Sequence, residues 1–273
     1  MNAIEIKAIC QQYGLTPSKS KGQNFLIDEN IVAKIVDSAN LDKKETVLEV
    51  GPGLGVLTAK LAQTAGRVVA VELDKKAIDY LQVAFLGVKN LEIVQNDILK
   101  LNLASLDLKN GDFKIVANLP YNITSYFLRL FLENSLIKPK EMILMVQKEV
   151  AERLTAQPGE MSVLSLVAQF FSQPEILFLV SKNSFWPVPA VDSAVIRLKI
   201  KEKLPNLDKK KLIQVIKFGF AARRKQLHNN LSAGLKISND QAKDILRALG
   251  FDEKIRAQDL ALADWQKIIA KLS

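Results

Sequence analysis

The fold of this chain is decided by the stretch Thr46-Val47-Leu48-Glu49-Val50-Gly51-Pro52-Gly53-Leu54-Gly55. Its first five residues form a short, mainly apolar run, which is typical of a strand buried inside a parallel sheet. A glycine turn follows, and a helical pattern then runs from about residue 56 to residue 65. A strand, a glycine turn and a helix N-terminus let a ligand approach the backbone closely, with N–H groups pointing outward. The stretch therefore predicts a ligand site at the end of a strand.

A second strand, expected over 67–73, adds the next part of this site. It carries Glu72, about 20 residues after the first glycine, where a carboxylate accepts from ribose hydroxyls. The glycines follow G-x-G-x-G, whereas a dinucleotide site uses G-x-G-x-x-G. This spacing suits an adenosine cofactor without a pyrophosphate, such as S-adenosylmethionine. Two alternatives stay open: a purely structural turn, and a nicotinamide site, which would usually need a proton donor or acceptor near the sheet.

Three further strands, over 91–95, 113–117 and 142–147, alternate with helical patterns. This alternation predicts an α/β fold with a doubly wound, mostly parallel sheet and right-handed crossovers. Asp97 and Ile98 follow the first of these strands. The Asp97 carboxylate can accept from an adenine amine, and Ile98 can pack on the ring; for Asp97 an Asx turn is the alternative.

Four acidic or amide residues thus fall at strand ends: Glu49, Glu72, Asp97 and Asn118. Because ligands bind at the carboxyl ends of strands in open α/β sheets, this repetition favours one shared site.

The segment Asn118-Leu119-Pro120-Tyr121 lies at such a strand end. The Asn118 side chain and the Leu119 backbone each offer a carbonyl acceptor to an NH2 group. Pro120 fixes a φ angle and holds the shape of the loop, and Tyr121 offers a flat face on which a base can stack. This chemistry suits an aromatic amine as the substrate. The alternative is an ordinary Asn-Leu-Pro turn, since turns favour these residues.

Composition limits the remaining possibilities. The chain has 273 residues, 48% of them hydrophobic and 25% charged, which is ordinary for a soluble globular protein. One cysteine, Cys10, and one histidine, His228, argue against an internal disulfide, a metal site and a Ser-His-Asp triad. We find no signal-peptide pattern and no apolar run long enough for a bilayer, so we expect a cytoplasmic protein without membrane or metal partners. A monomer is the default expectation.

The net charge of +9 lies entirely in the last third of the chain. Residues 183–273 hold 18 Lys and Arg against 9 Asp and Glu, whereas residues 1–182 hold 20 of each. Such asymmetry indicates a polyanion partner, and a solvated helical surface is the alternative. The densest basic run, Arg223-Arg224-Lys225, suits phosphate contacts. Lys19 and Lys21 add positive charge near the other end.

The pattern changes character after Leu204-Pro205. Strands give way to amphipathic helices, expected at about 209–222, 226–234, 239–249 and 259–271. We therefore expect two domains: residues 1–203, comprising an N-terminal arm of about 20 residues and the cofactor-binding domain, and residues 204–273, a small helical domain.

Two loops complete the candidate site. Residues 22–28 mix amides and apolar side chains before a helix for which Asp28 is a candidate N-cap. They can form a lid over a cofactor, with Asn24 hydrogen-bonding and Phe25 or Leu26 packing, or simply a staple onto the helix. Residues 184–189 are aromatic and rich in proline, and Phe185 can supply the second face of a stack around a flipped base. Core packing at a sheet edge is the alternative for Phe185.

Over essentially its full length the chain resembles the bacterial small-subunit (16S) ribosomal RNA adenine N6-dimethyltransferases, the KsgA family. The segments that carry the resemblance, in this order, are Gly22–Leu26, Glu49–Gly53, Val71–Asp74, Asn118–Ile123, Val188–Ser193 and Arg223–Lys225. The resemblance implies a class I S-adenosylmethionine-dependent methyltransferase with a Rossmann-like domain, followed by an all-helical RNA-binding domain. The implied activity is N6,N6-dimethylation of two adjacent adenines near the 3′ end of 16S rRNA in the small subunit, with a role in subunit biogenesis.

The resemblance also implies roles for individual residues. Cofactor contacts are carried onto Asn24, Leu26, Gly51, Gly53, Glu72, Asp97, Ile98 and Asn118. Target-base contacts are carried onto Asn118, Leu119, Pro120, Tyr121 and Phe185. One departure is visible: many members have a Tyr-Gly step before the next helix, where this chain has Pro158-Gly159-Glu160. That difference concerns RNA contacts near the loop.

Two alternatives share parts of this pattern. Methyltransferases of the macrolide-resistance type, which modify 23S rRNA, share the cofactor motif and the Asn-Leu-Pro-Tyr motif. The longer helical tail and the segment Val188–Ser193 favour the small-subunit target. The second alternative is an assembly factor that binds immature small subunits and for which catalysis is incidental; the basic helical third suits either.

Overall fold

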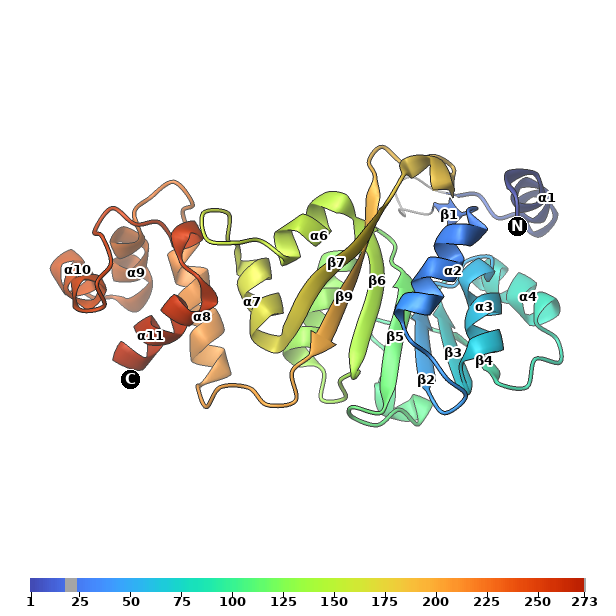
Figure 1. Ribbon diagram of the computed structural model, residues 1–273, viewed down its shortest axis with the longest axis horizontal. Coiled ribbons are helices and arrows are strands. Elements are labelled where there is room, and N and C mark those ends of the chain that lie inside the picture. Colours follow the sequence, from blue (N-terminus) through green and yellow to red (C-terminus); the bar gives the residue numbers. More distant parts are fainter. Residues whose placement is uncertain (18–23, 273) are drawn as a thin grey trace. The chain divides into compact units, whose positions relative to one another are not determined.

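A computed structural model describes residues 1–17 and 24–272. The described chain divides into two compact units (Figure 1). The first comprises Met1–Ala151 and Pro174–Ile200, and the second comprises Glu152–Gln173 and the residues from Lys201 onward. Packing thus groups residues 152–173 with the C-terminal helices, although they precede the last strand. The division into independent domains 1–203 and 204–273 stays a prediction.

A seven-stranded sheet forms the centre of the first unit. Its strands, in spatial order, are β4 (Leu91–Gln95), β3 (Arg67–Glu72), β2 (Thr46–Val50), β5 (Phe113–Asn118), β6 (Glu141–Gln147), β9 (Ser193–Ile200) and β7 (Ser172–Val180). The strands from β4 to β6 are parallel, and β9 runs antiparallel to β6. Val47, Leu48 and Val50 are almost fully buried, because a parallel strand is covered on both faces. The expected doubly wound, mostly parallel sheet is confirmed.

Helices α2 (Glu29–Ser38) and α3 (Val56–Thr64) cover one face of this sheet (Figure 1). Their apolar side chains, among them Ile35 and Leu61, share a core with residues of β2, β3, β5 and β6. Asp28 caps α2 as expected, since its carboxylate accepts from the backbone N–H groups of Asn30 and Ile31. Further elements of this unit include α4 (Lys75–Ala84), η2 (Leu103–Leu106), α5 (Thr124–Arg129), η3 (Leu130–Asn134) and η4 (Lys182–Ser184).

The N-terminal segment differs from the expected arm. Residues Ala3–Tyr13 form helix α1, which begins with a capping box between Asn2 and Glu5 and ends at Gly14. Ile6 and Cys10 are one helical turn apart, and both are buried in a small apolar cluster that includes Leu54. The apolar stripe of α1 is only two turns long, so the sequence pattern did not predict this helix. Residues 18–23 lie outside the described part of the chain.

The second unit is helical. It contains α7 (Val163–Phe171), α8 (Lys209–Gly219), α9 (Leu227–Leu235), α10 (Asn239–Ala248), η5 (Ala257–Asp259) and α11 (Leu262–Lys271), and α6 (Lys148–Leu154) crosses the boundary. Helix α8 ends at Gly219, three residues earlier than expected. Asn230 is the physical reason, since its side-chain amide donates to the carbonyl groups of Gly219 and Ala222 and fixes the turn that follows. The Trp265 side chain fills the core beside Gly219.

The described residues contain neither a membrane-spanning helix nor a cluster of metal ligands. None of the helices there is long and apolar enough to cross a membrane. In the same residues, no group of His, Cys, Asp or Glu side chains could hold a metal ion.

Candidate active site

The carboxyl ends of β4, β3, β2 and β5 meet two adjoining cavities in the first unit. The first cavity, of about 100 Å³, lies between the glycine turn, the segment 24–26 and the loop 118–121. The second, of about 400 Å³, lies over the ends of β3 and β4. Gly51, Glu72 and Pro120 line both cavities. The sheet therefore brings together the strand-end residues that the sequence had placed at one edge.

The glycine turn brings backbone against both cavities. Gly51 and Gly53 have φ angles of 67° and 58°, which side-chain-bearing residues rarely adopt. The Gly51 N–H donates to the carbonyl of Val71 at 2.9 Å, so the turn is tied to β3. A Cβ atom at Gly53 would lie 3.2 Å from the Phe25 ring. Glycine thus permits both the backbone conformation and the close approach of Phe25.

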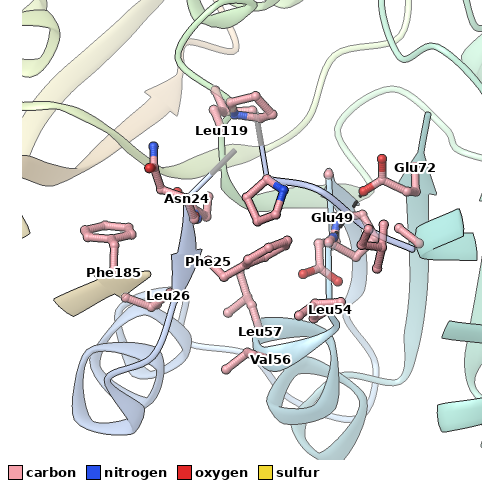
Figure 2. Close-up of a pocket in the computed structure, with 18 of the residues that line it drawn as sticks. Asn24, Phe25, Leu26, Glu49, Leu54, Val56, Leu57, Glu72, Leu119 and Phe185 are labelled. Carbon is pink, nitrogen blue, oxygen red and sulfur yellow. Dashed lines mark hydrogen bonds between the residues drawn. The ribbon is translucent and has the colours of Figure 1, made fainter. Parts of the chain in front are cut away.

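The Glu72 carboxylate is held in place by backbone donors. One oxygen accepts from the Gly53 N–H at 3.1 Å (Figure 2). The other accepts from the N–H groups of Leu73 and Asp74 at 2.8 and 2.9 Å. These bonds fix the carboxylate between the two cavities and leave lone pairs on its oxygens. A rigid acceptor of this kind can bind a pair of neighbouring hydroxyl groups.

Glu49, the next-to-last residue of β2, lines the first cavity (Figure 2). Its side chain is 1% exposed, and Oε2 has no hydrogen-bond partner among the described residues. Burial raises the pKa of Glu49 to about 8; the Thr58 hydroxyl offsets part of this shift, and the Glu72 charge adds to it. A buried acceptor without a partner is costly, so this oxygen fits a ligand that brings a donor.

The second cavity is lined by Asp97 and Ile98. Ile98 is buried and presents an apolar wall. The Asp97 carboxylate accepts from the Leu99 N–H at 3.0 Å, so the Asx turn considered from the sequence is present. The same carboxylate lines the cavity, so the turn serves to orient it. Lys100 lies 3.8 Å from its other oxygen, and that lysine is largely exposed.

Asn118 stands between the glycine turn and the N-terminal segment. Its Nδ2 atom donates to the Asn24 carbonyl at 3.4 Å, which directs the amide and leaves Oδ1 as an acceptor. The Leu119 N–H donates to the Met145 carbonyl of β6 and holds the loop onto the sheet. The half-buried Tyr121 side chain places its hydroxyl 2.9 Å from Ser193 Oγ. Asn24 and all four loop residues line the first cavity.

Comparison with known proteins identifies the chain. A family model described as ribosomal RNA adenine dimethylase matches residues 15–273. The chain belongs to this family. It is 40% identical over 97% of its length to ribosomal RNA small subunit methyltransferase A of Dehalococcoides mccartyi, and covers 91% of that protein. The protein of the same name from Desulfitobacterium hafniense is 42% identical over 93% of this chain and 92% of its own length.

Two solved structures share the fold across 91% of the chain. A dimethyladenosine transferase from Plasmodium falciparum is 27% identical, with a TM-score of 0.77 over 97% of that protein. The 23S rRNA methyltransferase ErmE is 26% identical, with a TM-score of 0.72 over 99% of that protein. These comparisons confirm the family resemblance and the class I methyltransferase fold, and with it S-adenosylmethionine as the cofactor.

Phe185 lies beside the segment 24–26 and lines the first cavity. It belongs to β8 (Phe185–Trp186), which pairs antiparallel with β1 (Phe25–Leu26), and Leu26 lies opposite Phe185. Both Leu26 and Phe185 are buried in the core that covers the sheet, and both line the first cavity. Only 1% of Phe185 is exposed, so in this conformation its ring packs in the core. A stacking role for Phe185 stays a prediction.

The basic residues expected to bind RNA lie in different parts of the chain. Arg223, Arg224 and Lys225 are exposed in the turn between α8 and α9 of the second unit. Lys19 and Lys21 lie outside the described residues. His228, next to the basic turn, is buried, with its ring nitrogens 3.0 and 2.9 Å from the side chains of Asn239 and Gln226. Both ring nitrogens of His228 thus have hydrogen-bond partners within the second unit.

Sequence reasoning missed several residues that line the first cavity. Phe25 was expected only as one of two packing choices, because no local pattern places its ring against Gly53. Glu49 was recognised at a strand end, but nothing in the pattern showed that one oxygen would be buried without a partner. Residues 15–17 follow α1 and line the same cavity. The sequence pattern did not indicate a role for residues 15–17, because helix α1, which precedes them, was not expected.

Proposed function

We propose that this protein transfers methyl groups from S-adenosylmethionine to the N6 atoms of two adjacent adenines near the 3′ end of 16S rRNA, and dimethylates each. One observation carries the proposal. Asn118 lies at the carboxyl end of β5, lines the first cavity, and has its Nδ2 atom bound to Asn24, which leaves Oδ1 to accept from an amine. The small-subunit target is supported by the names of relatives at about 40% identity.

The residues around the cavities fit the cofactor. Asp97 and Ile98 would hold its adenine in the second cavity, and Glu72 would accept from the ribose hydroxyls. Gly51 and Gly53 would let the amino-acid portion approach the backbone. The Glu49 oxygen without a described partner would accept from the α-ammonium group. Asn24 and Leu26 would close the first cavity over it. S-adenosylmethionine supplies an electrophilic methyl group on a sulfonium when bound.

The loop 118–121 would promote methyl transfer by positioning the adenine amine. The N6 lone pair of adenine is delocalised into the ring, so the amine is a poor nucleophile. Asn118 Oδ1 and the Leu119 carbonyl would accept the two amine hydrogens, orient the nitrogen and localise electron density on it. Tyr121 would hold the ring by stacking, Pro120 would keep the loop rigid, and Phe185 would bound the far side. No base is needed first, because the ammonium formed is acidic enough to lose its proton afterwards.

The basic turn would bind the RNA backbone. The side chains of Arg223, Arg224 and Lys225 are exposed. They suit contacts to phosphate groups, which position a protein on RNA without reading the base sequence. We expect Lys19 and Lys21 to contribute in the same way. The substrate would thus be the small subunit, where the ribosomal proteins and folded RNA present the target. We further propose that the protein acts in the cytoplasm as a monomer.

The decisive experiment uses labelled S-adenosylmethionine with two substrates: small subunits that lack adenine dimethylation, and naked large-subunit RNA. Product nucleosides would be resolved by mass. We expect N6,N6-dimethyladenosine on the small subunit and no label on the other RNA. Label on the large-subunit RNA would instead indicate a 23S rRNA methyltransferase of the macrolide-resistance type. Tight subunit binding without label on either substrate would leave an assembly factor.

A further inference from the structure

The segment Val188–Ser193 contains a feature that the proposed mechanism does not use. Ser193 is the first residue of β9, and its side chain is 0% exposed. Its Oγ atom lies 2.9 Å from the Tyr121 hydroxyl. A hydrogen bond thus joins two side chains that are 72 positions apart in the chain. One of them, Tyr121, lines the first cavity, where it is proposed to stack on the target adenine.

The frame that carries Ser193 is fixed on both sides. Ser193 lies opposite Gln147 at the end of β6, and its neighbour Asp192 is held by two bonds. The Asp192 carbonyl accepts from the Lys148 N–H at 3.0 Å, and its carboxylate accepts from the Lys182 N–H at 2.9 Å. The start of β9 is therefore tied to β6, α6 and the segment before β8. Ser193 Oγ is a fixed point relative to the sheet.

Tyr121 has fewer constraints of its own. It lies in a turn between β5 and α5, and its side chain is half-buried beside the cavity. A tyrosine ring turns about two torsion angles, and Pro120 restrains only the backbone before it. The bond at the far end of the ring removes this freedom, because it fixes the hydroxyl while the backbone fixes the Cα atom. Both ends of the side chain are then held.

We propose that Ser193 is a positioning residue for methyl transfer, and that it acts by holding the Tyr121 ring in the place that receives the target adenine. This inference rests on the proposed function, since it assigns Tyr121 to the base. The second methylation should depend on it most, because N6-methyladenine is bulkier and leaves less tolerance in the position of the ring. Loss of the bond would therefore slow the second transfer more than the first.

A structural explanation of the same bond makes different predictions. If the Tyr121 hydroxyl only satisfied a buried serine, removal of the Ser193 hydroxyl would change the stability of the fold and leave the product ratio unchanged. Ser172 provides a matched control. It is also buried at the first position of a strand, but its hydroxyl donates to the Ala168 carbonyl at 2.7 Å.

The test compares Ser193→Ala, Tyr121→Phe, the double variant and Ser172→Ala on small subunits that lack dimethyladenosine. We expect Ser193→Ala to lower the rate of the second transfer about 10-fold, to accumulate N6-methyladenosine, and to leave the Kd for S-adenosylmethionine within about twofold of the wild type. Tyr121→Phe should lower the rate of the second transfer by the same factor as Ser193→Ala. The double variant should lose no more rate than either single variant, because all three remove the same hydrogen bond. Ser172→Ala should keep the wild-type product ratio. A wild-type product ratio for Ser193→Ala, or additive losses in the double variant, would overturn the proposal.

A second measurement needs no activity. The chain has four tyrosines, so a 13Cζ-tyrosine label gives four ring signals, and Tyr121→Phe assigns one of them. The Ser193 bond lowers the pKa of Tyr121 against the effect of burial, so Ser193→Ala should raise the pKa read from that signal and Ser172→Ala should not. An unchanged titration in Ser193→Ala would show that the bond does not form. If the wild-type protein makes no dimethyladenosine, the proposed function fails, and this signal still tests the bond. In the activity test, Tyr121→Phe removes the same hydrogen bond and replaces Ser193→Ala if that variant does not fold.

Discussion

The strand edge of the first unit and the basic turn of the second unit serve one proposed reaction by different physical means. At the edge, Glu72 and Asn118 are held by hydrogen bonds to the backbone, and Glu49 is buried. In the turn, Arg223, Arg224 and Lys225 are exposed to solvent. The first arrangement holds a few atoms in defined positions, as positioning catalysis requires. The second provides charge that needs no exact geometry, as binding to a phosphate backbone requires. Changes at the edge should therefore alter rates, and changes in the turn should alter salt-dependent affinity.

The largest effect should follow Asn118→Ala. It removes the acceptor proposed for the adenine amine, so we expect methylation of small subunits to fall about 10³-fold, similar to the loss of one well-placed electrostatic group elsewhere. Binding to the subunit should change by less than about threefold, because the basic turn is untouched. The matched control is Asn110→Ala, an exposed amide before β5 that accepts from the Lys138 N–H. Near-normal turnover of Asn118→Ala would refute its role, and an equal loss in the control would point to folding.

The sequence could predict this edge because its signals are local. Apolar runs such as 46–50 mark buried strands, and the carboxyl ends of parallel strands lie on the same side of a sheet. The sequence alone therefore predicts that Gly51, Glu72, Asp97 and Asn118 lie close together. Contacts between distant segments were out of reach. The bond from Tyr121 to Ser193, the pairing of Leu26 with Phe185, and the Phe25 ring against Gly53 depend on how loops fold back over the sheet. Helix α1 was missed because its apolar stripe is short.

The pH dependence of stability should reveal the buried Glu49. Its folded-state pKa is about 8, against an ordinary value of 4.5. Between these values the folded protein keeps the proton and the unfolded chain loses it, so the free energy of unfolding should fall as pH rises from about 4.5 to 8. The fall should be on the order of 3 kcal/mol.

Glu49→Gln tests this assignment, since an amide does not titrate. Thermal unfolding of the cofactor-free protein, measured between pH 5 and 8, should depend less steeply on pH in Glu49→Gln than in the wild type. The exposed Glu202→Gln should keep the wild-type slope. Parallel curves for the wild type and Glu49→Gln would show that the carboxyl group is ionised in the folded state.

A smaller effect should follow loss of charge from the basic turn. Substitution of Arg223, Arg224 and Lys225 by Gln should weaken subunit binding about 10-fold near 0.15 M salt and reduce the slope of log K against log salt by about 2. The turnover rate at saturating subunit should stay within about twofold. The control removes three exposed lysines from α8 of the same unit, Lys209, Lys210 and Lys217. If both variants weaken binding equally, net charge rather than the turn is responsible.

The smallest effect should come from residues 158–160, where the family resemblance implies a Tyr-Gly step that this chain lacks. Gly159 has a φ angle of 104°, and a Cβ atom there would meet nothing within 4 Å. The N–H groups of Gly159 and Met161 both donate to the Gln258 carbonyl, so the loop is pinned within the second unit. Gly159→Ala should therefore cost about 1 kcal/mol of stability through backbone strain alone. Subunit affinity should not change if the loop has only this structural role. A loss of affinity larger than the loss of stability, measured by titration and by chemical denaturation, would instead place the loop against RNA and extend the phosphate-binding surface beyond the basic turn.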